Sequence, residues 1–336
     1  MPGYEAFAGA LARIAVDTGD RRVSRLVEDL RAPLRVGVRG RSGAGCRTVV
    51  RALRAAGLDA ADHPATSDLD VHVLVETLRS EDRVELAESP RPCVAVLNKA
   101  DLSGFGGAGP MAAAAARCGR IEGQTGVPTL PLVGLLAVAV ADEVLDDAVL
   151  EALRVLAAEP ADLRSVDGFV GLPHRLSGQM RARLLAGLDL FGIARAIALV
   201  RGGADRSAVI AGLRRASGLD SLLAAIERTA APVHYRRILN TIGPLAEIST
   251  GLGGDRVAGL LAGDDVVLAR MAAAVDVVPA RVMVGDTAGD YLNQAVFWQR
   301  YAQGPVSALH RACGSDIVRG SLRLWSRSGG VQEPAR

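Results

Sequence analysis

The sequence contains almost no lysine and few aromatic residues. Lys99 is the only lysine among the 39 basic residues, and the other 38 are arginine. Aromatic side chains account for 3% of the 336 residues, so the core must be built from small aliphatic side chains, which suit closely packed helices. The preference for arginine, with much alanine, glycine and valine, indicates a GC-rich genome such as that of an actinobacterium.

Paired cysteines and a strong net charge are also missing. The four cysteines are far apart and include no C-x-x-C spacing, which argues against a disulfide framework or a zinc site and favours a reducing compartment. The first residues lack the basic and apolar regions of a secretory leader, so we expect a cytoplasmic protein. A net charge of +2 gives no reason to expect nucleic acid as a partner.

No apolar run is long enough to span a bilayer. The longest, residues 127–141, has 15 residues with prolines near its start, whereas a membrane helix needs roughly 20. We expect a last buried strand that runs into a helix, and at most peripheral contact with a membrane.

Strand and helix patterns alternate in the first part of the chain. Apolar stretches of strand length and helical stretches follow one another at 34–38, 46–56, 70–76, 80–88, 92–97 and 109–124. This alternation is typical of a parallel sheet with helices on both faces. From residue 142 onward the pattern is helical, with a break expected at Ala231-Pro232.

A glycine-rich loop follows the first strand. Gly40 and Gly45 match the glycines of the phosphate-binding pattern G-x-x-x-x-G-K-[ST], with Gly43 and Ala44 between them. The backbone N–H groups of such a loop, with those of the next helix, can hold a phosphate without any side chain.

The loop departs from the pattern where side chains matter most. Cys46 replaces the lysine and Arg47 replaces the Ser/Thr, so the usual phosphate cation and Mg²⁺ hydroxyl are missing. In a second register Arg47 replaces the lysine and Thr48 becomes the metal ligand, although Arg41 and Cys46 then occupy the glycine positions. A thiol at a helix N-terminus is expected to have a lowered pKa and to be reactive, but a small buried residue is the simpler interpretation of Cys46.

A second motif follows the strand at 92–97. In the element N-K-x-D, here Asn98-Lys99-Ala100-Asp101, the aspartate accepts hydrogen bonds from guanine, the asparagine ties neighbouring loops, and the lysine ammonium contacts the phosphate loop. The same residue types are also common in ordinary turns. Because the element follows a buried strand and holds the only lysine, we predict that Asn98, Lys99 and Asp101 bind guanine.

The segments between the two motifs are short. Only 58 positions separate Gly40 from Asn98, and they contain no D-x-x-G. Thr66 is the only threonine between the first helix and the second strand. Asp68 and Asp70 are candidate Mg²⁺ carboxylates, but Asp70 opens a strand and is better explained as a cap. We therefore expect no switch segments and no efficient hydrolysis.

Taken together, these motifs make the chain resemble the bacterial dynamin-like GTPases of the TRAFAC class. The resemblance rests on a helical hairpin at 4–31, the glycine loop, the strand that begins at Asp70 and the N-K-x-D element, and it covers residues 4–141. It implies an α/β P-loop GTPase-like domain with a mostly parallel sheet, plus a large all-α helical domain. The expected parts are the hairpin packing on the helical domain (1–32), the GTPase-like domain (33–141), the helical domain (142–326) and a disordered tail (327–336).

Three functions stay open at this point. The first is a degenerate GTPase that acts as a regulatory or scaffolding subunit and binds GTP or GDP weakly. The second is an active GTPase whose site is completed by Arg47 and Thr48 or by a partner, and the third is a helical interaction module with a vestigial P-loop. We expect a protein partner, such as an intact GTPase-like paralogue. Mg²⁺ is not expected to bind well, because Thr48 is the best ligand that the loop offers.

Overall fold

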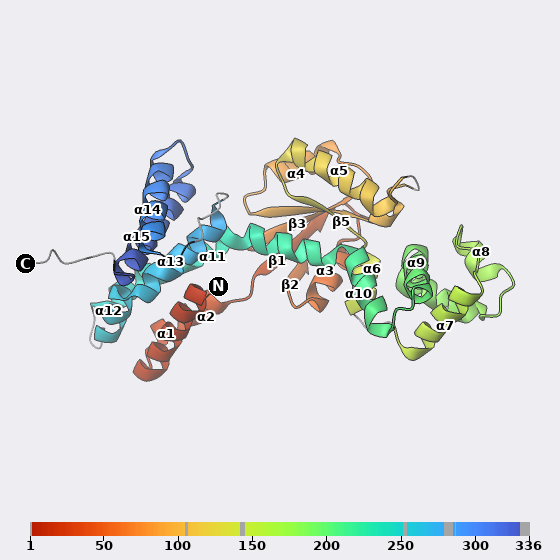
Figure 1. Ribbon diagram of the computed structural model, residues 1–336, viewed down its shortest axis with the longest axis horizontal. Helices are drawn as coiled ribbons and strands as arrows, with labels where there is room; N and C mark the ends of the chain where they lie inside the picture. Colours follow the sequence, from red (N-terminus) through yellow and green to blue (C-terminus); the bar gives the residue numbers. More distant parts are fainter. Residues whose placement is uncertain are drawn as a thin grey trace, which may run out of the picture. The chain divides into compact units, whose positions relative to one another are not determined.

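The computed structural model describes residues 2–104, 107–141, 145–250, 254–278, 285 and 287–329 (Figure 1). The chain divides into two compact units, one formed by residues 34–229 and the other by residues 1–33 and 230–336. The N-terminal hairpin thus belongs to the same unit as the C-terminal helices. The boundary expected at 141/142 coincides with neither unit boundary, and most of the tail predicted at 327–336 lies outside the described residues.

The unit at 34–229 contains a five-stranded sheet in the order β2-β1-β3-β4-β5, and every neighbouring pair is parallel. The strands are β1 (Arg35–Gly40), β2 (Asp59–Asp62), β3 (Leu69–Val75), β4 (Cys93–Asn98) and β5 (Thr129–Leu132). The predictions of strands at 34–38, 70–76 and 92–97 are confirmed by β1, β3 and β4. The valines and leucines of these strands are almost all buried, because helices pack against both faces of the sheet.

The described residues of this unit form eight complete α-helices and the first part of a ninth. They are α3 (Cys46–Ala55), α4 (Ser80–Ala87), α5 (Pro110–Thr125), α6 (Gly134–Ala141), α7 (Asp147–Ala158), α8 (Val166–Gly171), α9 (Gly178–Arg201), α10 (Arg206–Ser217) and the first part of α11 (Leu219–Ser249). Helices α4 and α5 lie on one face of the sheet and α3 lies on the other (Figure 1). The apolar run at 127–141 forms β5 and then α6, as expected, and none of the described helices is long and apolar enough to cross a bilayer.

Helices α7 to α10 belong with the sheet because they share its core. One buried cluster contains Leu97 of β4, Ile121 of α5, Leu153 of α7, Leu184 of α9 and Leu213 of α10. An apolar face that is buried against the sheet cannot also form the core of a separate helical domain, which explains where the unit boundary falls.

The second unit is entirely helical in its described part. It contains α1 (Pro2–Thr18), α2 (Arg21–Arg31), the rest of α11, α12 (Asp255–Ala262), α13 (Asp264–Val277), α14 (Ala288–Gln303) and α15 (Ala308–Arg327). Its core joins Phe7 and Leu11 of the hairpin to Tyr235, Trp298 and Ile317. Trp298 is fully buried and packs edge-on against Tyr301, so it is a core residue.

The helix break expected at Ala231-Pro232 is wrong. Helix α11 runs through Pro232 and Pro244 for 31 residues. Ala230, Ala231 and Tyr235 are buried around the first proline, and this burial outweighs the loss of one backbone hydrogen bond.

Candidate functional site

The glycine-rich loop joins the carboxyl end of β1 to α3. Gly40 has a φ of 154°, and a Cβ atom placed on it would lie 2.5 Å from the carbonyl oxygen of Val73. Gly45 has a φ of 91° and caps α3 in the left-handed conformation. Both positions therefore require glycine, which fits the register with glycine at 40 and 45. The loop leads into a ten-residue helix whose first N–H groups have no partners within the helix.

Asn98 ties three segments together at the carboxyl edge of the sheet. Its Nδ2 donates to the carbonyl oxygen of Ala44 at 2.8 Å, and its Oδ1 accepts from the backbone N–H of Gly134 at 3.1 Å. The side chain is 4% exposed, and a Cβ atom on Gly45 would lie 2.5 Å from its Nδ2. The amide therefore fixes the loop against the turn between β5 and α6.

Lys99 makes the second contact between the two motifs. It adopts a left-handed backbone conformation with φ 56° and ψ 40°, and its Nζ donates to the carbonyl oxygen of Gly43 at 3.3 Å. The structure thus contains the contacts expected of Asn98 and Lys99 with the loop backbone. The lysine ammonium is held at the loop without an acidic partner among the described residues.

Asp101 lies one turn further, in a short 3-10 helix at Ala100–Leu102. Burial raises the pKa of its carboxyl, and the charge of Asp189 raises it further, while Lys99 lowers it. No other side chain in the described part of the chain donates a hydrogen bond to this carboxylate. It is therefore a half-buried acceptor next to Lys99, positioned at the same edge as the glycine loop.

Cys46 is the first residue of α3 and is 8% exposed. Burial raises the pKa of its thiol, and the negative charge of Asp62 acts in the same direction. The lowered pKa expected from the helix N-terminus is therefore wrong, because loss of solvation outweighs the helix dipole. Cys46 fills space beneath Gly40 and is not a reactive thiolate.

Arg47 and Thr48 lie in the first turn of α3. The Arg47 side chain is exposed and forms no ion pair with the described residues. Thr48 turns its methyl group toward Gly134, where a Cβ atom would lie 3.3 Å from it. Thr48 therefore faces the turn that Asn98 also contacts, and Arg47 is the cation of this turn that remains available to a ligand.

A network that the sequence pattern does not reveal holds the loop from the side of α4. Arg41 donates from Nε to Oδ1 of Asp82 at 3.1 Å, and the Asp82 side chain is 1% exposed. Asp82 also accepts from the backbone N–H of Arg79 at 2.9 Å, and its Oδ1 lies 3.4 Å from His72 Nε2. The one signal in the sequence is His72 itself, a histidine at an inward position of a buried strand.

The carboxylates near the loop do not form a metal site. Among the described residues, no three His, Cys, Asp or Glu side chains come together as a metal site would require. Asp70, expected to cap its strand, instead forms ion pairs with Arg39 and Arg91. Asp62, beside Val38 in register, acts electrostatically on Cys46, and the sequence does not predict this because the segment around Asp62 has the composition of a turn.

Comparison of the chain with protein-family models, with curated proteins and with solved structures gives no match. The resemblance to bacterial dynamin-like GTPases therefore stays a prediction from the motifs. What the structure provides is a parallel α/β sheet with a glycine loop and an N-K-x-D element side by side at its carboxyl edge.

Proposed function

We propose that the chain binds a guanine nucleotide weakly, with little or no hydrolysis, and acts as a regulatory or scaffolding subunit. The observation that carries the proposal is the pair of contacts by which Asn98 and Lys99 hold the loop backbone while Asp101 keeps its carboxylate unpaired. The strand order supports it, because β2 and β3 lie on opposite sides of β1. Ligands of parallel α/β sheets bind at the carboxyl ends of strands where the order reverses in this way.

The base would be read by Asp101. A carboxylate can accept two hydrogen bonds at once, which matches the N1–H and 2-amino donors on one edge of guanine. Partial burial strengthens such charge-assisted bonds, and the raised pKa of Asp101 reflects the same burial. Adenine presents no matching pair of donors on that edge, so the carboxylate favours guanine.

The phosphates would be held mainly by backbone groups. The glycine loop and the N-terminus of α3 offer N–H donors and the positive end of the helix dipole. Arg47 adds an exposed cation at the first turn, whereas Cys46 adds no charge. Binding without the usual lysine and metal ion is expected to be weak, and the developing charge of phosphoryl transfer would not be stabilised.

The partner half of the proposal rests on exposed apolar side chains in the second unit. Leu292, Val296 and Phe297 of α14 are 42%, 41% and 48% exposed. Exposed apolar side chains on one helix are typical of surfaces that bind another protein. We infer that a protein partner, such as an intact GTPase-like paralogue, binds this part of the chain.

Calorimetric titration with GDP and GTP, with and without Mg²⁺, tests the nucleotide site. We expect binding of both nucleotides, and a loss of about tenfold or more for Asp101→Asn with guanine nucleotides. The same variant should bind xanthine nucleotides better, because xanthine presents a carbonyl where guanine presents the 2-amino donor. Asp167→Asn on α8 is the matched control, since Asp167 is exposed and far along the chain from the motifs.

Two outcomes would contradict this proposal. Absence of GDP and GTP binding at high micromolar concentration would leave the interaction module with a vestigial loop as the remaining function. Unchanged base preference in Asp101→Asn would refute the placement of the base. The unpaired Arg47 favours a second candidate, hydrolysis completed by a partner subunit, and Mg²⁺-dependent turnover that Asp101→Asn abolishes would establish it.

A further inference from the structure

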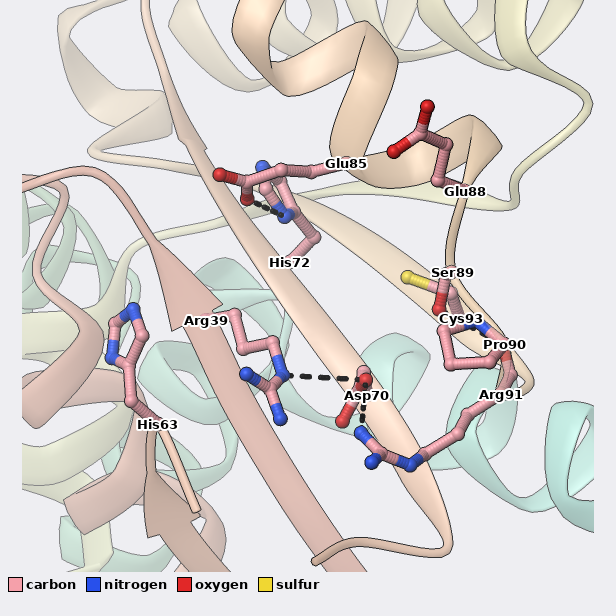
Figure 2. A pocket seen from close by; sticks show the side chains of 10 residues that line it. All are labelled: Arg39, His63, Asp70, His72, Glu85, Glu88, Ser89, Pro90, Arg91 and Cys93. Atoms are coloured by element: carbon pink, nitrogen blue, oxygen red, sulfur yellow. Dashed lines mark hydrogen bonds and ion pairs between the residues drawn. The ribbon is translucent and has the colours of Figure 1, made fainter. Parts of the chain in front are cut away.

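A polar pocket of about 410 Å³ lies on the sheet face that carries α4 (Figure 2). Its floor is formed by side chains of neighbouring strands, since Arg39 pairs in register with His72 and Asp70 pairs with Cys93. None of the residues assigned to the phosphate loop or to the base lines it. The pocket is therefore distinct from the nucleotide site and does not depend on the function proposed for that site.

The pocket exists because the connection from β2 to β3 is unusually short. Parallel strands are normally joined by a dozen or more residues that form a helix, but only residues 63–68 join these two. This segment lies directly on β1, where a Cβ atom on Gly37 would be 2.9 Å from Ser67 Oγ. No crossover helix covers this part of the sheet face, so polar side chains line an open space.

One end of the pocket is positively charged. Arg39 Nε lies 3.3 Å from Asp70 Oδ2, and Arg91 Nη1 lies 3.2 Å from the same oxygen. Asp70 also accepts from Ser67 Oγ at 2.5 Å and is 5% exposed. Figure 2 shows the two guanidinium groups converging on Asp70, one from Arg39 on β1 and the other from Arg91 in the segment before β4. One buried carboxylate thus positions two arginines. Arg39 also donates from Nη2 to the Pro64 carbonyl oxygen at 2.9 Å, which leaves its Nη1 for a ligand, together with the other donors of Arg91.

The opposite end is negatively charged. Glu85 and Glu88, at the end of α4, line the pocket on the side away from the two arginines (Figure 2). Glu85 Oε2 lies 3.5 Å from Nδ1 of the buried His72, while Glu88 has no partner among the described side chains. The two ends therefore carry charges of opposite sign across one small space.

We propose that this pocket binds a small zwitterion of the size of an α-amino acid. The ligand carboxylate would accept hydrogen bonds from Arg39 and Arg91, and its ammonium group would donate to Glu88 and Glu85. A simple anion would meet the glutamates, and a simple cation would meet the arginines, so only a molecule with both charges is matched at both ends. The volume lies at the small end of the range for ligand pockets.

The pocket is suited to binding and not to covalent chemistry. Two candidate nucleophiles line its wall, Ser89 and Cys93. The Ser89 hydroxyl donates to the backbone carbonyl of Arg91 at 3.1 Å, and burial raises the pKa of the Cys93 thiol to about 12. The thiol therefore stays protonated near neutral pH. Asp70 is fully occupied by Ser67, Arg39 and Arg91, so it positions the arginines and is not a base.

Ligand-observed saturation-transfer NMR on the full chain, with the standard L-α-amino acids at millimolar concentration, tests the proposal. N-acetylated and carboxamide derivatives of the amino acids that bind serve as probes lacking one charge. Calorimetry then measures the affinity of the strongest ligand for Glu88→Gln and for Arg91→Gln. Glu81→Gln is the matched control, because Glu81 is exposed on the same helix but does not line the pocket.

We expect Glu88→Gln and Arg91→Gln each to weaken binding by about tenfold, since each removes one charge-assisted hydrogen bond. Both singly charged derivatives should bind more weakly than the parent amino acid, and Glu81→Gln should bind normally. Glu88→Gln keeps the test valid if Arg91→Gln fails to fold, because the Glu88 side chain has no hydrogen-bond or ion-pair partner among the described residues. Absence of amino-acid binding, equal binding of the N-acetyl derivatives, or an unchanged affinity of Glu88→Gln would each overturn the proposal.

Discussion

Two buried polar residues of the same sheet are stabilised in opposite ways. Asn98, at the carboxyl end of β4, forms hydrogen bonds with the backbone of Ala44 and Gly134. Asp70, at the start of β3, forms hydrogen bonds and ion pairs with side chains, including Arg39 and Arg91. Asn98 is therefore stabilised by neutral hydrogen bonds to the backbone, whereas Asp70 is stabilised mainly by charged side chains.

The largest effect is expected from Gly45→Ala at the carboxyl edge. The new Cβ atom would lie 2.5 Å from Asn98 Nδ2 at a residue with a φ of 91°. Left-handed strain and the clash together should reduce the free energy of unfolding by about 3 kcal/mol, measured by urea denaturation.

Gly43→Ala is the control for this substitution. Gly43 also has a positive φ, of 80°, but no atom lies within 4 Å of its added Cβ. Gly43→Ala should lower the free energy of unfolding by about 1 kcal/mol, from backbone strain alone. Equal costs for the two variants would show that Asn98 does not restrict the loop.

Substitutions of the two buried residues, Asn98 and Asp70, should change the free energy of unfolding by a smaller amount. Asn98→Ala leaves the Ala44 carbonyl and the Gly134 N–H without partners, which should cost about 2 kcal/mol. Asp70→Asn should cost about 1 kcal/mol, because its two arginines are 31% and 28% exposed and water can solvate them. Thermal and urea unfolding of both variants measure the difference, and the reverse order would contradict the contrast drawn between the two regions.

The smallest expected effect is a pH-dependent difference in folding stability between the wild type and Asp101→Asn. Burial raises the pKa of this carboxyl above its ordinary value of 3.8 in the folded state. The protonated carboxyl is therefore favourable to folding. Its full contribution to the stability of the folded protein is present below the pKa that Asp101 has in the unfolded chain, and it is lost as the pH rises through the pKa that Asp101 has in the folded protein. At pH 7 the neutral asparagine should make the fold more stable by about 0.5 kcal/mol.

Unfolding curves for the wild type and Asp101→Asn at several pH values test this prediction. The difference should shrink as the pH falls toward the pKa of Asp101, where the wild-type carboxyl becomes neutral. A variant that is less stable than the wild type at pH 7 would mean that an unrecognised donor stabilises the Asp101 carboxylate.

The strands that could be predicted are the ones with a short apolar pattern. Valines recur in β1, β3 and β4, and leucines join them in β3 and β4, so these segments read as strands in the sequence. β2, with the sequence Asp-Ala-Ala-Asp, has no such pattern, and only its pairing with β1 makes it a strand. Helix α11 could not be predicted as one element because its burial, not its local propensity, carries it through Pro232.

The candidate site also has one part that the sequence predicts and one part that it does not. The contacts of Asn98 and Lys99 with the loop follow from two local motifs whose spatial relation is set by parallel strands. The network of Arg41, Asp82 and His72 joins three elements through side chains, and no local pattern encodes their meeting. The pocket on the sheet face depends on a missing crossover helix, and its opposite charges come from separate elements of the fold.

The contact between Lys99 and Gly43 has a consequence for covalent modification. Lys99 is the only lysine in the chain, so every acylation or ubiquitin-type conjugation of a lysine side chain must fall on this one residue. Acylation would remove the charge of the Nζ that now donates to the Gly43 carbonyl. A modification of Lys99 would therefore act directly on the glycine loop.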